Sequence, residues 1–320
     1  MNTNRSLLGS GWSMVMHNKR YIFWFWLLNL TLAEFGTAMF RKSAHALLDH
    51  SAYSDRLLHG FDMSVLIELF ARPEFPSLQA MSTQSTYFAF LFFLFTAMFL
   101  PGVFAGYAST YRLPREDFFR ACGRNLWRFI RLMLIAGIIM GIVTGVLFGI
   151  SGAIGKSAAE STNEVLPFEL QMISLAVIFL VMTTLRIWFD LAEADVVLND
   201  QRAVRKSLAA AFRHTFGGLF RLLGSYVMSA IVAAILLVGG IWCWLHLVPA
   251  PAWIRAFLIG QITLFLLLIP RFWQRGVAVS YWQQKMMIPV VTAPPLVVTE
   301  TPPTPTMPTV VNTPPEPQAS

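Results

Sequence analysis

The sequence predicts an all-α, polytopic membrane protein with six transmembrane helices. Two observations predict this fold class. Six apolar stretches each approach the ~20 residues that an α-helix needs to cross ~30 Å of hydrocarbon. Only 13% of the residues are charged, about half the ~25% typical of a soluble domain. The six stretches are residues 21–40, 87–109, 132–150, 171–189, 222–245 and 253–270.

Basic residues predict the orientation of these stretches. Eighteen of the 24 Lys and Arg residues lie in segments 1–20, 112–131, 186–221 and 271–285. Because cytoplasmic connections of membrane proteins carry an excess of Lys and Arg, these four segments are expected in the cytoplasm. We therefore predict a multi-pass membrane protein with both termini cytoplasmic. The first stretch is expected to be a retained anchor and not a cleaved signal peptide.

Composition divides the chain into three parts. Residues 1–20 form an amphipathic N-terminal segment, and residues 21–285 form the six-helix membrane domain with cytoplasmic connections at 112–131 and 190–221. The last 32 residues hold ten of the chain's 18 prolines. Such a segment buries too little apolar surface to order itself. We expect residues 286–320 to be a disordered cytoplasmic tail, with docking of a protein partner as an alternative role.

The longest predicted outer loop covers residues 41–86. Within it, Phe61, Val65, Leu66, Leu69 and Phe70 recur at helical spacing, which predicts a helix on the membrane or over the bundle. Two pairs in the loop have the i, i+4 spacing of metal ligands on a helix; they are His45 with Asp49 and Asp55 with His59. No second paired-His motif completes a metal geometry, so a solvated helix face is the favoured interpretation and no metal is predicted.

Three basic amphipathic segments each precede an odd-numbered stretch, at residues 11–20, 118–128 and 203–213. We interpret them as interfacial helices that each begin a transmembrane hairpin, which makes three repeats. The alternative is that membrane proteins generally place Arg and Trp at the ends of their spans. The cations expected to contact anionic lipid head groups are Arg120, Arg124, Arg128, Arg131, Arg205, Lys206 and Arg213.

A stripe of glycines follows the third stretch. Gly137, Gly141, Gly145 and Gly149 recur every fourth residue, so they share one face of a helix. Glycine lets another helix backbone approach closely in a membrane. A neighbouring span is the expected partner, and residues 102–106 of the second stretch offer the same spacing at Gly102 and Gly106; a seam between two copies of the chain is the alternative.

Residues 192–207, Ala-Glu-Ala-Asp-Val-Val-Leu-Asn-Asp-Gln-Arg-Ala-Val-Arg-Lys-Ser, resemble a connection found in a known group of proteins. The segment is similar to the cytoplasmic connection of bacterial six-span proteins related to the membrane domain of glycerophosphoryl diester phosphodiesterases and to several uncharacterised families. The resemblance covers roughly residues 5–285 and implies the six-span architecture and a place in the bacterial inner membrane. No phosphodiesterase domain accompanies it in this sequence, so the resemblance does not imply that activity.

Few ionisable residues lie within the apolar stretches. Glu34 is a candidate proton relay or cation ligand, although a salt bridge with Arg41 or Lys42 is the favoured interpretation. Asp190, Glu193 and Asp195 cluster just after the fourth stretch, and Arg186 lies near the end of that stretch. Asp190 follows Arg186 by four residues, so a local ion pair, or a pair with Arg residues of a neighbouring interfacial helix, is favoured over metal binding.

The sequence predicts no enzyme. The segment Gly155-Lys156-Ser157 lacks the leading glycine of a phosphate-binding loop, because Ile150 occupies that position. No catalytic or dinucleotide-binding motif is present in the sequence, and no cofactor is expected. The net charge of +7 is spread beside the spans, which argues against nucleic acid as a partner. A membrane scaffold or lipid-interacting module is expected, with a transporter of small molecules or lipids as the alternative and self-association as a further possibility.

Overall fold

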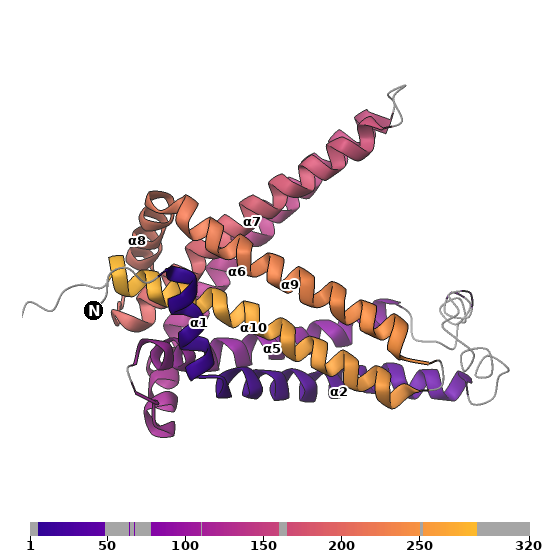
Figure 1. Ribbon diagram of the computed structural model, residues 1–320, viewed down its shortest axis with the longest axis horizontal. Helices are drawn as coiled ribbons and strands as arrows, with labels where there is room; N and C mark the ends of the chain where they lie inside the picture. Colours follow the sequence, from indigo (N-terminus) through magenta and orange to yellow (C-terminus); the bar gives the residue numbers. More distant parts are fainter. Residues whose placement is uncertain are drawn as a thin grey trace, which may run out of the picture. The chain divides into compact units, whose positions relative to one another are not determined.

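The computed structural model describes residues 6–48, 64, 67, 78–109, 111–159, 165–249 and 252–286. Over these ranges the protein is all-helical, with eight α-helices and no strand (Figure 1). The helices are α1 (Leu7–His17), α2 (Arg20–Leu48), α5 (Leu78–Ala108), α6 (Arg115–Ala159), α7 (Leu166–Leu198), α8 (Val204–Gly217), α9 (Leu219–Leu247) and α10 (Trp253–Lys285).

Five of these helices, α5, α6, α7, α9 and α10, are long and apolar enough to cross a membrane. Helix α2 contains the first predicted span but is not one of the five; Asn29 and Glu34 interrupt its apolar run. A sixth span therefore stays a prediction. The loop helix expected at 61–70, the paired candidate metal ligands of the loop and the Pro-rich tail lie wholly or partly outside the described residues.

Short polar residues and glycine mark several helix boundaries. The Ser6 hydroxyl caps α1 by accepting a 3.2 Å hydrogen bond from the backbone N–H of Gly9. A turn at Asn18 separates α1 from α2, and Gly218 separates α8 from α9. No such break occurs in α6, where the predicted interfacial segment 118–128 continues directly into the third span. The second interfacial segment is thus not a separate helix, unlike α1 and α8.

Most of the buried side chains belong to one end of the long helices. They come from residues 100–107 of α5, 187–197 of α7 and 272–282 of α10, with parts of α1, α2, α6, α8 and α9 packed around them. We call this assembly the packed base. Figure 1 shows α1, α8 and the C-terminal part of α10 at the same end of the helices. The base is where helices from all parts of the described chain meet.

Beyond the packed base, the helices expose large apolar side chains. Ile138 and Ile142 of α6 are each 62% exposed, and Val238 of α9 is 65% exposed. A water-soluble fold rarely presents continuous apolar surface of this extent. Lipid is the surrounding that makes such a surface favourable, because the acyl chains replace the missing protein contacts.

Helix α1 crosses α10 at a pair of glycines. A Cβ atom at Gly276 would lie 2.6 Å from the Gly11 carbonyl oxygen, so neither position has room for a side chain. The Trp273 indole N–H donates a 2.9 Å hydrogen bond to the Leu8 carbonyl oxygen, and the Trp12 ring packs edge-on against it. The N-terminal segment is therefore packed on protein along one face.

The glycine stripe of α6 does not pack as predicted. A Cβ atom at Gly137, Gly141, Gly145 or Gly149 would meet no described atom within 4 Å. The proposed facing glycines are also occupied elsewhere, since Gly102 lies against Phe118 and Cys122 of α6 and Gly106 lies against Tyr21 of α2. Helix α7 packs on a different face of α6, where Ser151 hydrogen-bonds Ser174 at 2.8 Å. The prediction of an intramolecular glycine seam is wrong for the described chain.

Candidate functional site

One face of α7 carries charged residues into the packed base. Arg186, Asp190 and Glu193 are spaced by four and three residues, so they lie on the same side of the helix. Asp190 and Glu193 are 7% and 8% exposed. Asp190 Oδ2 accepts a 2.8 Å hydrogen bond from the Tyr226 hydroxyl of α9 and lies 3.9 Å from Arg186 Nε. The expected pair of Arg186 with Asp190 is present, but it is part of a larger buried group.

Helix α10 supplies the remaining charges of this group. Arg271 and Arg275, four residues apart, act electrostatically on Glu193 together with Arg186 and Asp190. Arg275 is buried, and its guanidinium lies 5.3 Å from the centre of the Phe272 ring. The Glu193 Oε2 and Arg275 Nε atoms are buried and form no hydrogen bond with the described residues. We call Arg186, Asp190, Glu193, Tyr226, Arg271 and Arg275 the ionic cluster.

Asp195 belongs to a separate contact. Its Oδ1 atom accepts a 2.6 Å hydrogen bond from the Asn199 side-chain amide and a 3.3 Å hydrogen bond from the Trp282 indole N–H. Asp195 thus fastens the end of α7 to α10 and does not join the ionic cluster. The sequence placed these four residues together, whereas the structure brings three together and assigns the fourth to another face.

The composition of the ionic cluster suits a structural role, in which its side chains hold helices together. Burying a charge is costly unless opposite charges and hydrogen bonds compensate it, and here two carboxylates face three guanidinium groups. Nowhere in the described chain do three or more His, Cys, Asp or Glu residues gather as a metal site would require. The cluster joins α7, α9 and α10 into one unit.

Several predicted surface positions also find partners. Glu34 Oε2 lies 2.9 Å from Arg41 Nη1, the salt bridge favoured for it, and both side chains are exposed. Asp200 Oδ1 accepts a 2.5 Å hydrogen bond from Arg128 and lies 3.9 Å from Arg124 Nε. The hydrogen bond from Arg128 lowers the pKa of Asp200 below its ordinary value. Arg128 is therefore turned toward protein and is less available to lipid than its place in the sequence predicts.

The other cations predicted at head groups lie on the surface. Arg120 pairs with Asp117 at 3.0 Å, and the Arg131 guanidinium lies 5.1 Å from the centre of the Trp127 ring. Arg205, Lys206 and Arg213 of α8 are exposed. These side chains are positioned where a charged surface can meet solvent or lipid head groups.

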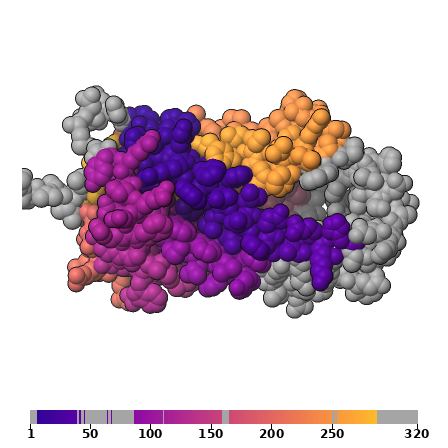
Figure 2. Space-filling model, turned by 90° about the horizontal axis from the view of Figure 1, so that it is seen from below, coloured from indigo at the N-terminus to yellow at the C-terminus, as the bar shows by residue number. Residues whose placement is uncertain are grey.

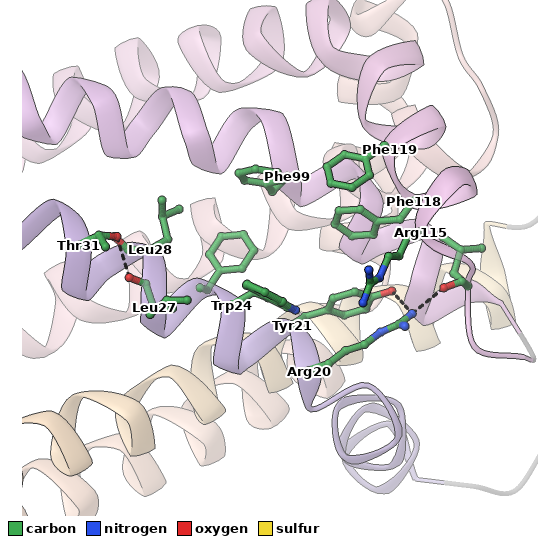
Figure 3. Close-up of a pocket in the computed structure, with 12 residues that line it drawn as sticks. Arg20, Tyr21, Trp24, Leu27, Leu28, Thr31, Phe99, Arg115, Phe118 and Phe119 are labelled. Carbon is green, nitrogen blue, oxygen red and sulfur yellow. Dashed lines mark hydrogen bonds between the residues drawn. The ribbon is translucent and has the colours of Figure 1, made fainter.

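A cavity of about 620 Å³ lies beside α2. On the face seen in Figure 2, α2 runs beside α5, next to the start of α6. The cavity is lined by Arg20, Tyr21, Trp24, Phe25, Leu27, Leu28, Thr31, Phe99, Leu113, Arg115, Phe118 and Phe119. Figure 3 shows the two arginines at one end of the cavity and Leu27, Leu28 and Thr31 at the other.

The cationic end of the cavity is held in place by the protein. Arg20 Nη2 donates hydrogen bonds of 2.8 Å to the Leu113 carbonyl oxygen and 3.1 Å to the Tyr21 hydroxyl. Its Nε atom is buried and has no hydrogen-bond partner among the described residues. Neither Arg20 nor Arg115 forms a salt bridge within the described ranges.

The sequence does not predict that Arg20 and Arg115 line the same cavity. It also does not predict that α10 contributes arginines to the ionic cluster. Arg20 is one of the basic residues of segment 11–20, and nothing in that segment indicates a contact with Arg115, which lies 95 positions further along the chain. For the cluster a signal existed: Arg-x-Trp occurs at Arg186 and again at Arg271. This similarity indicates that Arg186 and Arg271 occupy matching positions near the ends of two spans. It does not predict that these two ends are in contact.

The chain matches no protein-family model, and comparisons with curated proteins and with solved structures give no match.

Proposed function

We propose that this protein is a non-enzymatic membrane scaffold that interacts with lipid in the inner membrane of a bacterium. The observation that carries the proposal is the cavity beside α2, whose apolar wall ends at two arginines without a carboxylate partner among the described residues. Such a combination suits an amphiphile, because one site offers both apolar contact and positive charge. The ionic cluster, in contrast, is compensated internally and supports a structural role.

The proposed architecture has six spans in three repeats, and matching contacts support it. The Trp188 indole N–H donates a 2.9 Å hydrogen bond to the Leu208 carbonyl oxygen of α8, as Trp273 does to Leu8 of α1. The Trp188 ring packs edge-on against Phe212 with ring centres 5.2 Å apart, the same separation as for Trp273 and Trp12. In both places the end of an even-numbered span packs against the amphipathic helix of another repeat.

A third contact in the proposed series joins α5 to α6. Phe104 is the proposed counterpart of Trp188, because it precedes Ala108 by four residues as Trp188 precedes Ala192. The centres of the Phe104 and Phe129 rings are 6.3 Å apart, and Cys122 Sγ lies 3.8 Å from the Phe99 carbonyl oxygen. The three repeats would then contact each other in a closed cycle, with α5 against α6, α7 against α8 and α10 against α1. The resemblance to phosphodiesterase membrane domains stays a prediction.

The packed base is proposed to lie at the cytoplasmic face, with both termini on that side. The excess of Lys and Arg in the connections that form it supports this orientation. Labelling of single cysteines in intact cells tests it. Positions in 41–86 should react with an impermeant reagent, and positions in 112–131 should be protected; the opposite pattern would reverse the proposed topology.

Lipid interaction is tested by purifying the full chain in mild detergent and measuring the retained phospholipid by mass spectrometry. A stoichiometric phospholipid that survives extensive washing is the expected result. A matched membrane protein without an amphiphilic cavity, prepared in the same way, gives the background. Retention no higher than that background would contradict a lipid-interacting function.

A transporter is the second candidate. The observation that favours it is that Glu193 Oε2 and Arg275 Nε are buried without a hydrogen-bond partner among the described residues, because ionisable groups within membrane helices often mark solute or proton pathways. Glu34, the residue proposed from the sequence for that role, pairs with Arg41 and does not line the described cavity. Uptake of a solute into vesicles that contain the wild type, with loss of uptake in Glu193→Gln and not in Glu34→Gln, would support transport in place of a scaffold. Self-association and a partner for the tail stay predictions.

A further inference from the structure

The cavity beside α2 has one charged end and one long apolar wall. From this geometry we propose that it seats one anionic phospholipid of the cytoplasmic leaflet, with the phosphate between Arg20 and Arg115 and one acyl chain along α2. The inference rests on the proposed lipid-interacting function and deepens it by naming the lipid class and the site.

The charge at the polar end is positive and already oriented. Arg20 is fixed by its hydrogen bonds to Leu113 and Tyr21, so binding an anion there costs little side-chain entropy. Arg20 lines the cavity, and its guanidinium carries a fixed positive charge and N–H donors suited to phosphate oxygens. With Arg115 at the same end and no described carboxylate paired to either residue, the site favours a head group of net negative charge (Figure 3).

The apolar wall has the length of one leaflet. The lining residues of α2 run from Arg20 to Thr31, and eleven residues of helix rise about 16 Å. Half of a ~30 Å hydrocarbon core is about 15 Å. A lipid whose phosphate contacts Arg20 would therefore extend its chain past Leu27 and Leu28 to the middle of the bilayer.

Access from the side is open. Trp24 and Phe119 line the cavity, yet both are 59% exposed, so the cavity has a lateral opening between α2 and the start of α6. In a bilayer this opening faces lipid. A phospholipid can then enter by lateral diffusion without leaving the membrane.

The volume of about 620 Å³ fits part of one lipid and not several. Pockets for single small ligands occupy about 300–1,000 Å³. A free phosphate would use only the polar end and leave the apolar wall, including Leu28 and Phe99, without a role. A phospholipid uses both ends, which is why we favour it over a soluble anion.

The test measures phosphatidylglycerol and phosphatidylcholine retained by the full chain after exchange into vesicles that contain both. The wild type should retain phosphatidylglycerol in preference. The double variant Arg20→Ala, Arg115→Ala should lose about twenty-fivefold in affinity, since each cation near the surface contributes on the order of a fivefold factor. The charge-matched control Lys156→Ala, Arg255→Ala removes two exposed cations that do not line the cavity, and it should retain the lipid as the wild type does.

Two further variants keep the test decisive if the double Ala variant folds poorly. Leu28→Trp fills the apolar wall and should lose phosphatidylglycerol although both arginines remain. Arg20→Lys, Arg115→Lys keeps the charge and should bind more lipid than the Ala pair. Thermal unfolding of each variant shows whether it is folded.

The remaining outcomes separate this site from the broader function. Equal retention by the Arg20, Arg115 Ala pair and the Lys156, Arg255 control would overturn the site while leaving lipid interaction intact. Equal retention of the two lipids by the wild type would overturn the anionic class, and displacement of the lipid by inorganic phosphate alone would show that the site binds a free anion. No retained lipid on the wild type would contradict the proposed function itself.

Discussion

The crossing of α1 over α10 and the stripe along α6 both present glycine on a helix face, but only the crossing is closed by a neighbour. At Gly11 and Gly276 the two backbones are in contact, whereas the four glycines of α6 face open space within the described chain. The more regular pattern is thus the one without a protein partner. Spacing tells which residues share a face, and only the fold tells whether that face is covered.

The largest loss of stability is expected where α1 crosses α10 at Gly11 and Gly276. Gly276→Leu would force a side chain into the Gly11 backbone, and overpacking of this kind costs typically about 1–3 kcal/mol or more. We expect a clearly lower midpoint of thermal unfolding in a mild detergent. Gly260→Leu on the same helix, where a Cβ meets nothing within 4 Å, is the control. Equal behaviour of the two variants would show that the crossing does not hold the base together.

A second loss of stability is expected from a substitution in the ionic cluster of the packed base. Tyr226→Phe removes the hydroxyl that donates to Asp190 and leaves a buried carboxylate with one partner fewer. Loss of a hydrogen bond to a buried charge costs about 1–3 kcal/mol. Tyr87→Phe, at an exposed position of α5, is the matched control and should leave unfolding unchanged. If both variants unfold like the wild type, the ionic cluster does not stabilise the packed base.

Acid should weaken the contact at Asp200 by a smaller amount. Because its folded-state pKa is lowered by Arg128, this carboxylate stabilises the fold above its unfolded pKa, and the contribution is lost as the pH falls through the folded pKa. Thermal unfolding measured from neutral pH to below pH 4 should therefore show less acid sensitivity in Asp200→Asn. Both groups are partly solvated, so added salt should also reduce the difference. An unchanged acid response would exclude this ion pair as a contributor.

The smallest effect is expected on the open stripe. Gly141→Leu with Gly145→Leu should change the stability of the monomer by less than about 0.5 kcal/mol, because neither new side chain meets a described atom. The measurement is thermal unfolding at low protein concentration, beside cross-linking in the membrane. A large loss of stability, or loss of a cross-linked dimer, would show that the stripe is covered by a second copy.

Much of the fold follows from residue patterns that depend on neighbours along the chain. The five apolar helices, the pair of Arg186 with Asp190 and the salt bridge of Glu34 all arise from spacing or composition. These features are predictable because a helix brings residues four apart to one face whatever surrounds it.

Contacts between distant helices were not predictable in the same way. Arg275 lies beside Glu193, and Arg20 shares a cavity with Arg115, only because the helices pack as they do. In lipid, an apolar helix face can be either buried against protein or exposed to acyl chains. The spacing of the α6 glycines therefore predicts a packing surface without showing whether a neighbouring helix covers it. Close packing had to be seen in the structure at Gly11 and Gly276, where no glycine repeat marks it.

The hydrogen bond from Trp273 to Leu8 joins residues 265 positions apart, which has a consequence for synthesis. At about 5–20 residues per second, a ribosome needs roughly 13–53 s to make the intervening chain. During that time α1 exists without the surface of α10 that covers Gly11. A chain that stops before α10 leaves this face of α1 uncovered permanently, so completion of the last helix is the step that encloses the first.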